Sequence, residues 1–132
     1  MIENKVCNIT ADELNSIRQE AKAVDAHLVE IQGNEIQSWD EYLNKIEIAF
    51  QFPNEWRVNI DGYNDWMCDL DWLRKESYVL IIHDYSEFLT QNLECKEMIM
   101  EIFCDLILPW WQKDVEKYVV NGRSKPFNVY LV

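Results

Sequence analysis

The amino-acid sequence predicts an α/β domain, in which helices flank a small three-stranded parallel sheet and an extra helix precedes it at the N-terminus. Three strand-like runs, at residues 27–31, 78–82 and 127–132, are separated by longer segments whose apolar residues recur at helical spacing. Residues 78–82 form an almost unbroken apolar run, which is typical of a parallel strand covered on both faces. Strands that are separated by helices favour parallel pairing.

The first helix is predicted from a capping box, in which Thr10 and Glu13 each satisfy a free backbone amide. We expect this helix to run to about Val24. Residues 1–26 are therefore interpreted as an N-terminal helical extension, and residues 27–132 as one globular unit. The sequence leaves open whether the extension packs on the sheet or assists a partner.

The first predicted strand, His27–Ile31, ends at a turn in which Gly33 is expected to adopt a positive φ. Ser38 and Glu41 form a second capping box, and the helix that they begin stops before Pro53. Five apolar side chains recur on one face of this helix and are predicted to enter the core: Trp39, Tyr42, Leu43, Ile46 and Phe50.

A further helix is predicted over residues 59–73, and its inward-facing residues are Ile60, Tyr63, Met67 and Leu70. A long helical stretch begins at Asn92. Pro109 either kinks this stretch or starts a new helix, and we favour two consecutive helices because proline suits the first helical position. The pair Trp110-Trp111 is interpreted as helix packing.

The chain is strongly acidic, with 24 Asp and Glu residues against 12 Lys and Arg residues and a formal net charge of -12. This charge repels nucleic-acid phosphates and anionic lipids, so neither nucleic acid nor membrane is an expected partner. The same charge accelerates encounter with a basic protein. A basic protein partner is therefore predicted, although acidity also serves solubility.

Cysteine usage and the N-terminal residues both point to the cytoplasm. Cys7, Cys68, Cys95 and Cys104 show neither a C-x-x-C pair nor the regular spacing of a disulfide framework, so reduced thiols are expected. The first residues lack a charged region followed by an apolar run, and no stretch approaches the length of a membrane span.

One predicted helix carries an acidic face. Asp61, Asp65 and Asp69 follow the spacing i, i+4 and i+8, and Asn59 and Asn64 lie in the same stretch. Like charges at this spacing destabilise a helix by roughly 0.2–0.5 kcal/mol per pair. Two interpretations stay open, a solvated helix face and a surface that is kept for a partner.

Enzymatic alternatives have weaker support. A magnesium site for phosphate-ester hydrolysis, built on Asp61, Asp65, Asp69 and Asp71, is disfavoured because eight helical residues span about 12 Å. His83-Asp84 has no serine or cysteine motif around it, and the glycine-rich phosphate loops are absent from the sequence. The sequence therefore predicts no catalytic residue, cofactor or metal.

Several segments resemble the barstar family in their order and spacing. They are residues 32–38, Phe52-Pro53, Asn59-Ile60-Asp61 with Asp65, and residues 125–132. The similarity runs from about His27 to Val132, roughly four fifths of the chain. It implies a barstar-like fold, and an intracellular immunity protein or antitoxin that inhibits a basic, barnase-like ribonuclease.

The resemblance also implies a partner-binding surface. Asn59, Asp61 and Asp65 match the family's binding helix, with Asp65 at the carboxylate that enters the phosphate site of the nuclease. Asp105 matches an acidic position on a neighbouring helix. The whole predicted surface consists of Trp56, Asn59, Asp61, Asn64, Asp65, Asp69 and Asp105.

Two departures from the family pattern affect this expectation. The segment 55–58 keeps only Trp56 of an aromatic pair followed by glycine, and Asn64 stands where the family has a tryptophan beside the key aspartate. A different nuclease or a shifted docking pose is the natural inference. The alternative function is a barstar-like interaction module that binds a basic non-nuclease partner.

Overall fold

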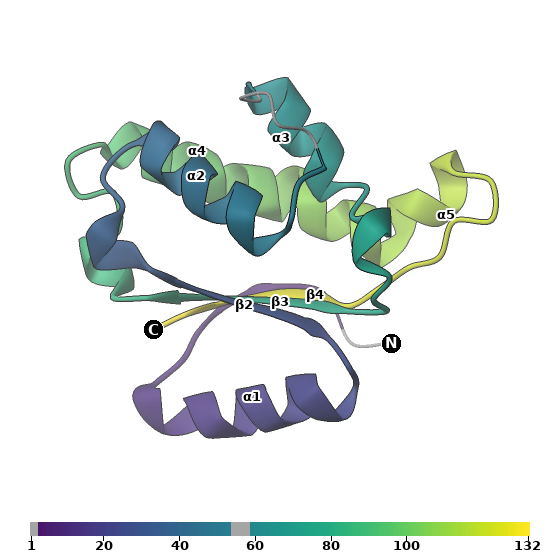
Figure 1. Ribbon diagram of the computed structural model, residues 1–132, viewed down its shortest axis with the longest axis horizontal. Coiled ribbons are helices and arrows are strands. Elements are labelled where there is room, and N and C mark those ends of the chain that lie inside the picture. The colour runs from purple at the N-terminus through teal and green to yellow at the C-terminus, as the bar shows by residue number, and fades with distance from the viewer. Residues whose placement is uncertain (1–2, 54–58) are drawn as a thin grey trace.

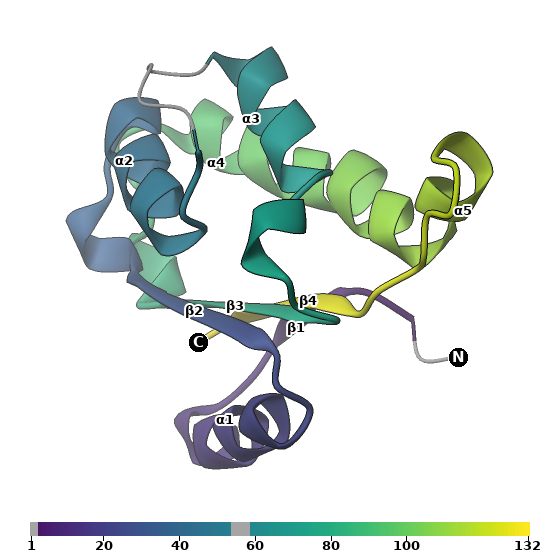
Figure 2. The ribbon, with the colours of Figure 1, turned by 45° about the vertical axis from the view of Figure 1, so that its right-hand side comes forward.

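The computed structural model of the protein describes residues 3–53 and 59–132. One parallel sheet has the strand order β1-β4-β3-β2, and its strands are β1 (Val6–Asn8), β2 (His27–Gln32), β3 (Tyr78–His83) and β4 (Phe127–Leu131). Helices α2 (Trp39–Ala49), α3 (Ile60–Met67), α4 (Leu93–Ile102) and α5 (Val115–Tyr118) cover one face of the sheet, and α1 (Leu14–Ala23) covers the other (Figures 1 and 2). The predicted parallel sheet between helices is confirmed, but it has four strands rather than three.

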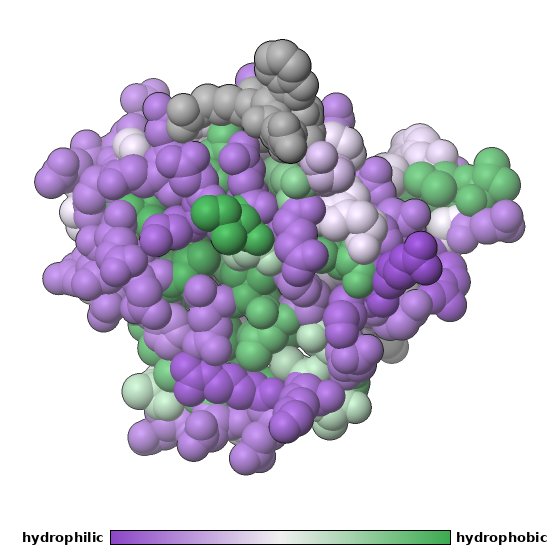
Figure 3. All heavy atoms as spheres, in the orientation of Figure 1, coloured by the Kyte–Doolittle hydropathy of each residue, from purple (hydrophilic) through white to green (hydrophobic). Residues whose placement is uncertain are grey.

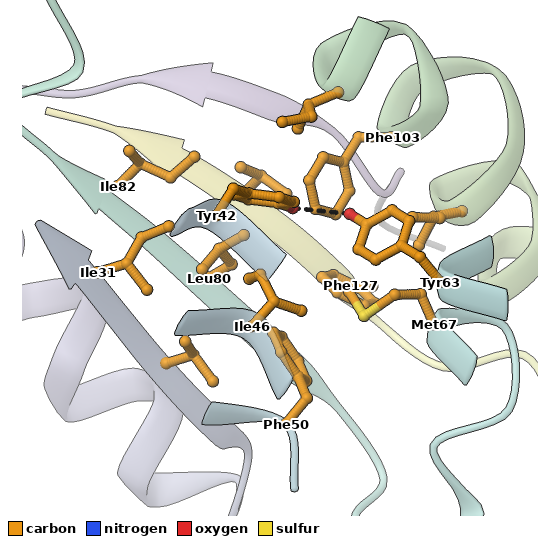
Figure 4. Close-up of a cluster of buried hydrophobic side chains, with 14 of the residues drawn as sticks. Ile31, Tyr42, Ile46, Phe50, Tyr63, Met67, Leu80, Ile82, Phe103 and Phe127 are labelled. Carbon is orange, nitrogen blue, oxygen red and sulfur yellow. Dashed lines mark hydrogen bonds between the residues drawn. The ribbon is translucent and has the colours of Figure 1, made fainter. Parts of the chain in front are cut away.

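The main core lies between the sheet and the layer of α2 to α5 (Figure 4). Strand β3 is hydrogen-bonded on both sides, with Leu80 opposite Val29 of β2 and Val129 of β4. All three of these side chains are buried. The apolar run at residues 78–82 therefore occupies the interior position that its composition predicts.

Helix α1 (Leu14–Ala23) follows a 3₁₀ turn, Ala11–Glu13. The Glu13 carboxylate accepts a hydrogen bond from the Thr10 amide at 3.1 Å, as the capping pattern predicts. Arg18 donates two hydrogen bonds to the Glu30 carboxylate of β2, at 2.7 and 3.1 Å, and these lower the pKa of Glu30. Nε2 of His83 lies 2.7 Å from the same carboxylate, so His83 belongs to this polar cluster.

The N-terminal segment also supplies strand β1, which the sequence analysis missed because three residues are too short to show alternation. Asn4, just before β1, makes three hydrogen bonds through its side chain. Its amide nitrogen donates to the carbonyl oxygens of Leu108 and Lys125, and its oxygen accepts from the backbone N–H of Phe127. Residues 4–8 are therefore attached to the edge of the sheet and to the long helix, in addition to the packing of α1 on the sheet.

Helix α2 (Trp39–Ala49) begins at Ser38, whose hydroxyl accepts from the Glu41 amide at 3.1 Å. The 3₁₀ turn Gly33–Glu35 joins β2 to this helix, and the prediction of a positive φ at Gly33 is wrong. Glycine is needed there for space, because a Cβ atom would lie 2.5 Å from the carbonyl oxygen of His83. The turn therefore packs directly against the backbone at the end of β3.

The chain is helical without a break from residue 93 to residue 118, so the prediction of two separate helices is wrong. Helix α4 (Leu93–Ile102) continues through π-helical turns at Phe103–Ile107 and Trp110–Asp114 into α5 (Val115–Tyr118). Pro109 has a helical φ of -62° but no N–H to donate. The wider π turns on either side rearrange the backbone hydrogen bonds around it.

The remaining short elements are the 3₁₀ turns Asp71–Leu73 and Tyr85–Glu87, one before β3 and one after it. Within residues 3–53 and 59–132, no helix is long and apolar enough to cross a membrane.

Replacing Asn4 with alanine tests the attachment of the N-terminal segment. The variant Asn4→Ala leaves two carbonyl oxygens and one amide without their partner, and we expect a loss of about 1–3 kcal/mol in the free energy of unfolding. Urea denaturation followed by circular dichroism measures it. Asn15→Ala, on the exposed side of α1, is the control, and equal stability of the two variants would contradict the assignment.

Candidate functional site

The acidic helix α3 (Ile60–Met67) begins at Asn59. The Asn59 side-chain oxygen accepts a hydrogen bond from the Gly62 amide at 2.8 Å, which satisfies one of the free donors at the helix start. Asp61 lies in the first turn, where the helix dipole favours a negative charge. Asn59 therefore has a structural role in addition to its predicted place on the binding surface.

The inner face of α3 is anchored in the aromatic part of the core. Tyr63 and Met67 are fully buried, and the hydroxyl of Tyr63 is 2.7 Å from the hydroxyl of Tyr42 on α2 (Figure 4). The Trp39 ring packs edge-on against Tyr63, with 5.3 Å between ring centroids. These contacts fix the rotation of α3 about its axis.

The outer face of α3 carries Asp61 and Asp65, both exposed and one helical turn apart. Together with Asn59 they form what we call the acidic face. Neither aspartate forms an ion pair with a described residue. The two negative charges are therefore presented to solvent by a helix whose opposite side is fixed.

Helix α3 is shorter than predicted. It ends at Met67, and Leu70 adopts a left-handed conformation with φ 52° that places its side chain in the core. Asp69 therefore lies beyond the helix, where its carboxylate accepts from the Asp71 amide at 3.2 Å. The predicted row of three aspartates on one face is wrong for Asp69. Ile60, predicted to face inward, is instead 38% exposed.

The end of α3 is held by Trp111, whose indole N–H donates to the carbonyl oxygen of Met67 at 2.9 Å. Trp111 is buried and packs against Tyr78 of β3, whereas Trp110 stacks on Tyr118. The Trp-Trp pair therefore serves packing, as predicted, but no pattern in the sequence indicates that Trp111 supports the acidic helix.

Asp105 lies on the π-helical turn Phe103–Ile107, and this turn packs against α3. Its carboxylate is exposed and forms no ion pair with any residue of the described ranges. The structure thus places Asp105 on the element next to the acidic face, which is where the resemblance puts it.

Two other residues of the predicted partner-binding surface, Asn64 and Trp56, are not among the exposed, described acidic residues. Asn64 is half-buried, and its side-chain oxygen is buried without a hydrogen-bond partner among the described residues. Trp56, with the rest of the segment 55–58, lies outside the described residues. The neighbouring Trp66 packs edge-on against Trp72 at 5.2 Å, at the base of the helix.

Metal chemistry has no evident location in this site. In the parts of the chain that the structure describes, no group of three or more His, Cys, Asp or Glu side chains is arranged to hold a metal ion. Asp69 and Asp71 lie beyond the end of α3, so the four aspartates of the magnesium alternative do not share one helix.

On the face that Figure 3 shows, hydrophilic side chains surround a central apolar area. An exposed acidic helix that is anchored on its inner side has the physical properties of a binding surface for a cation-rich partner. A comparison with protein families finds that the model described as Barstar (barnase inhibitor) matches residues 26–131. The chain belongs to the barstar family. No curated protein and no solved structure matched it.

Trp111→Phe tests the support of α3. The substitution removes the indole N–H that caps Met67, and we expect the free energy of unfolding to fall by about 1 kcal/mol more than in Trp110→Phe. Trp110→Phe is a matched control, because the same atoms are removed and the Trp110 N–H is buried without a described partner. Urea denaturation compares the two, and a larger loss for Trp110→Phe would contradict the assignment.

The reactivity of the Cys68 thiol depends on the negative charge of Asp65 and can be used to test it. Burial, and then the negative charge of Asp65, raises the pKa of Cys68 to about 12. At pH 8.5 the thiol therefore stays protonated, and we expect iodoacetamide to label Cys68 roughly a hundredfold or more slowly than an unperturbed cysteine. Asp65→Asn should accelerate labelling and Asp61→Asn should not, as measured by mass spectrometry of the Cys68 peptide. Equal rates in the two variants would contradict this arrangement.

Proposed function

We propose that the protein inhibits a basic ribonuclease of the barnase type by inserting the acidic face of α3 into the nuclease's active-site cleft. The observation that carries the proposal is the presentation of Asp61 and Asp65 on a helix anchored by Tyr63 and Met67. Both aspartates are exposed, and neither forms an ion pair with another residue that the structure describes. Membership of a family described as barnase inhibitors supports the same function.

The proposed mechanism is substitution of the substrate phosphate by a carboxylate. A ribonuclease cleft that binds a scissile phosphate is cationic, and an aspartate on a rigid helix forms charge-assisted hydrogen bonds with the same groups. Asp65 is assigned this role, while Asp61 and Asp105 meet flanking cations. RNA is then excluded because the cleft is filled and its positive charge is neutralised.

Rigidity makes this arrangement effective. The acidic face needs no ordering on binding, since α3 is capped at Asn59, held at Met67 and hydrogen-bonded through Tyr63. Pre-ordered groups avoid the entropic cost that a flexible acidic segment would incur. The net charge of -12 adds long-range attraction, which raises the association rate with a basic protein.

In this proposal the protein acts stoichiometrically, without catalysis or cofactor, as a one-to-one immunity protein or antitoxin in the cytoplasm. Partner binding is assigned to the full predicted set of residues, which are Trp56, Asn59, Asp61, Asn64, Asp65, Asp69 and Asp105. Asn64 in place of the family's tryptophan alters the surface beside Asp65, so the docking details are expected to differ from those of other family members.

Inhibition of barnase, assayed by cleavage of a fluorogenic RNA, tests the proposal. We expect the wild-type protein to abolish cleavage. Asp65→Asn should weaken inhibition by roughly 10- to 100-fold, because a hydrogen bond between charged groups contributes about 1.5–3 kcal/mol. Raising the salt concentration should slow association.

The control is Asp12→Asn, which removes one exposed carboxylate in the turn directly before α1, the helix on the opposite face of the sheet (Figure 1). If the wild-type protein does not inhibit cleavage, or if Asp65→Asn inhibits as well as Asp12→Asn does, the proposed function or its surface is overturned. Tight binding of a basic protein without ribonuclease activity would instead favour a non-nuclease interaction module.

A further inference from the structure

A groove of about 530 Å³ lies between the start of α3 and the first half of α4. Its apolar lining comes from Trp39 of α2, Ile60 of α3, and Cys95 and Met98 of α4. Residues of three helices therefore converge on one depression immediately beside Asp61, at the edge of the acidic face.

The apolar lining is both accessible and firmly held. Ile60, the first residue of α3, is 38% exposed, and Cys95, which lines the same groove, is buried. Trp39 packs against both Tyr42 and Tyr63, and Met98 packs on the main core cluster. A preformed groove of this kind accepts an apolar side chain without rearrangement of its walls.

The rim of the groove on α4 is acidic. Glu94, Glu97 and Glu101 are exposed and line the groove, at the spacing i, i+3 and i+7 of one helix face. Asp105 continues the same row one turn further along, next to the acidic face. The row therefore joins the groove to the surface assigned to the ribonuclease.

This rim is not neutralised within the described ranges of the chain, since none of the three glutamates forms an ion pair there. Lys96, on the same helix, donates instead to the carbonyl oxygen of Tyr85 and lies over the Tyr85 ring. The groove thus combines an apolar floor with uncompensated negative charge, which complements an apolar side chain flanked by lysine or arginine.

We propose that this groove is a second contact site for the same ribonuclease, and that it binds a surface segment outside the nuclease's active site in which an apolar residue is flanked by basic residues. The inference rests on the proposed function and extends its surface along α4. A nucleic acid would be repelled by the rim, and a second copy of this chain would bring its own net charge of -12.

The test compares two double charge reversals in barnase binding, with association and dissociation rates measured by surface plasmon resonance. Glu97→Lys/Glu101→Lys alters the groove, and Asp12→Lys/Glu20→Lys changes the net charge equally on exposed positions of the α1 side. Both variants should associate more slowly. The groove variant alone should also dissociate about tenfold faster or more, because it loses contacts at the interface.

Ile60→Ala tests the contribution of the apolar groove lining to binding without changing the charge of the protein. It should also accelerate dissociation, while its urea midpoint stays near that of the wild-type protein because Ile60 is partly exposed.

If the groove variants dissociate like the wild-type protein while Asp65→Asn dissociates faster, the proposed groove contact is overturned and the proposed function stands. Absence of barnase inhibition by the wild-type protein overturns both. A wild-type dimer that Glu97→Lys/Glu101→Lys disperses in analytical ultracentrifugation would assign the groove to self-association instead.

Discussion

The hydrogen bond between the hydroxyls of Tyr42 and Tyr63 is the contact on which the acidic helix depends. Both side chains are fully buried, and burial raises the pKa of both phenols, so both hydroxyls stay protonated even at an alkaline pH at which an exposed tyrosine ionises. Each hydroxyl is the other's partner at 2.7 Å, and a buried hydroxyl without a partner would be costly. The pair therefore requires one relative placement of α2 and α3.

This constraint explains how eight residues form a stable helix despite two like charges on one side. An isolated helix of this length is marginal in water, so α3 owes its stability to tertiary contacts. The cap at Asn59, the indole of Trp111 at Met67 and the buried Tyr63 hold its two ends and its middle. Charge repulsion of a few tenths of a kcal/mol is small against these contacts.

The sequence predicted what local pattern determines and missed what tertiary contacts determine. Capping boxes located α1 and α2, and the apolar run at 78–82 located the interior strand. The end of α3 could not be predicted from a local pattern. It depends on Leu70, which adopts a left-handed conformation and packs in a core formed by distant segments. The turn at Gly33 was predicted correctly, but the reason given for the glycine was wrong. Glycine is required there because the backbone of His83 leaves no space for a Cβ atom.

In the candidate site, too, local pattern predicted some features, and tertiary contacts determine the others. Asp61, Asp65 and Asp105 were predicted from spacing and resemblance, and the structure shows that all three are exposed. Exposed charges can be predicted in this way because they need no precise packing partner. The role of Trp111 depends on a contact between residues 67 and 111, which no local pattern encodes. Strand β1 has no periodicity of its own, and its place is set by Asn4 and by pairing with β4.

That pairing has a consequence for folding. Val6 lies opposite Val129, so β1 and β4 join segments that are far apart along the chain, and such closure is entropically slow. Until it occurs, the outer edge of β4 offers unpaired backbone groups to any neighbouring strand. The N-terminal segment, which lies almost entirely before the family match at residues 26–131, thus shields an edge prone to aggregation.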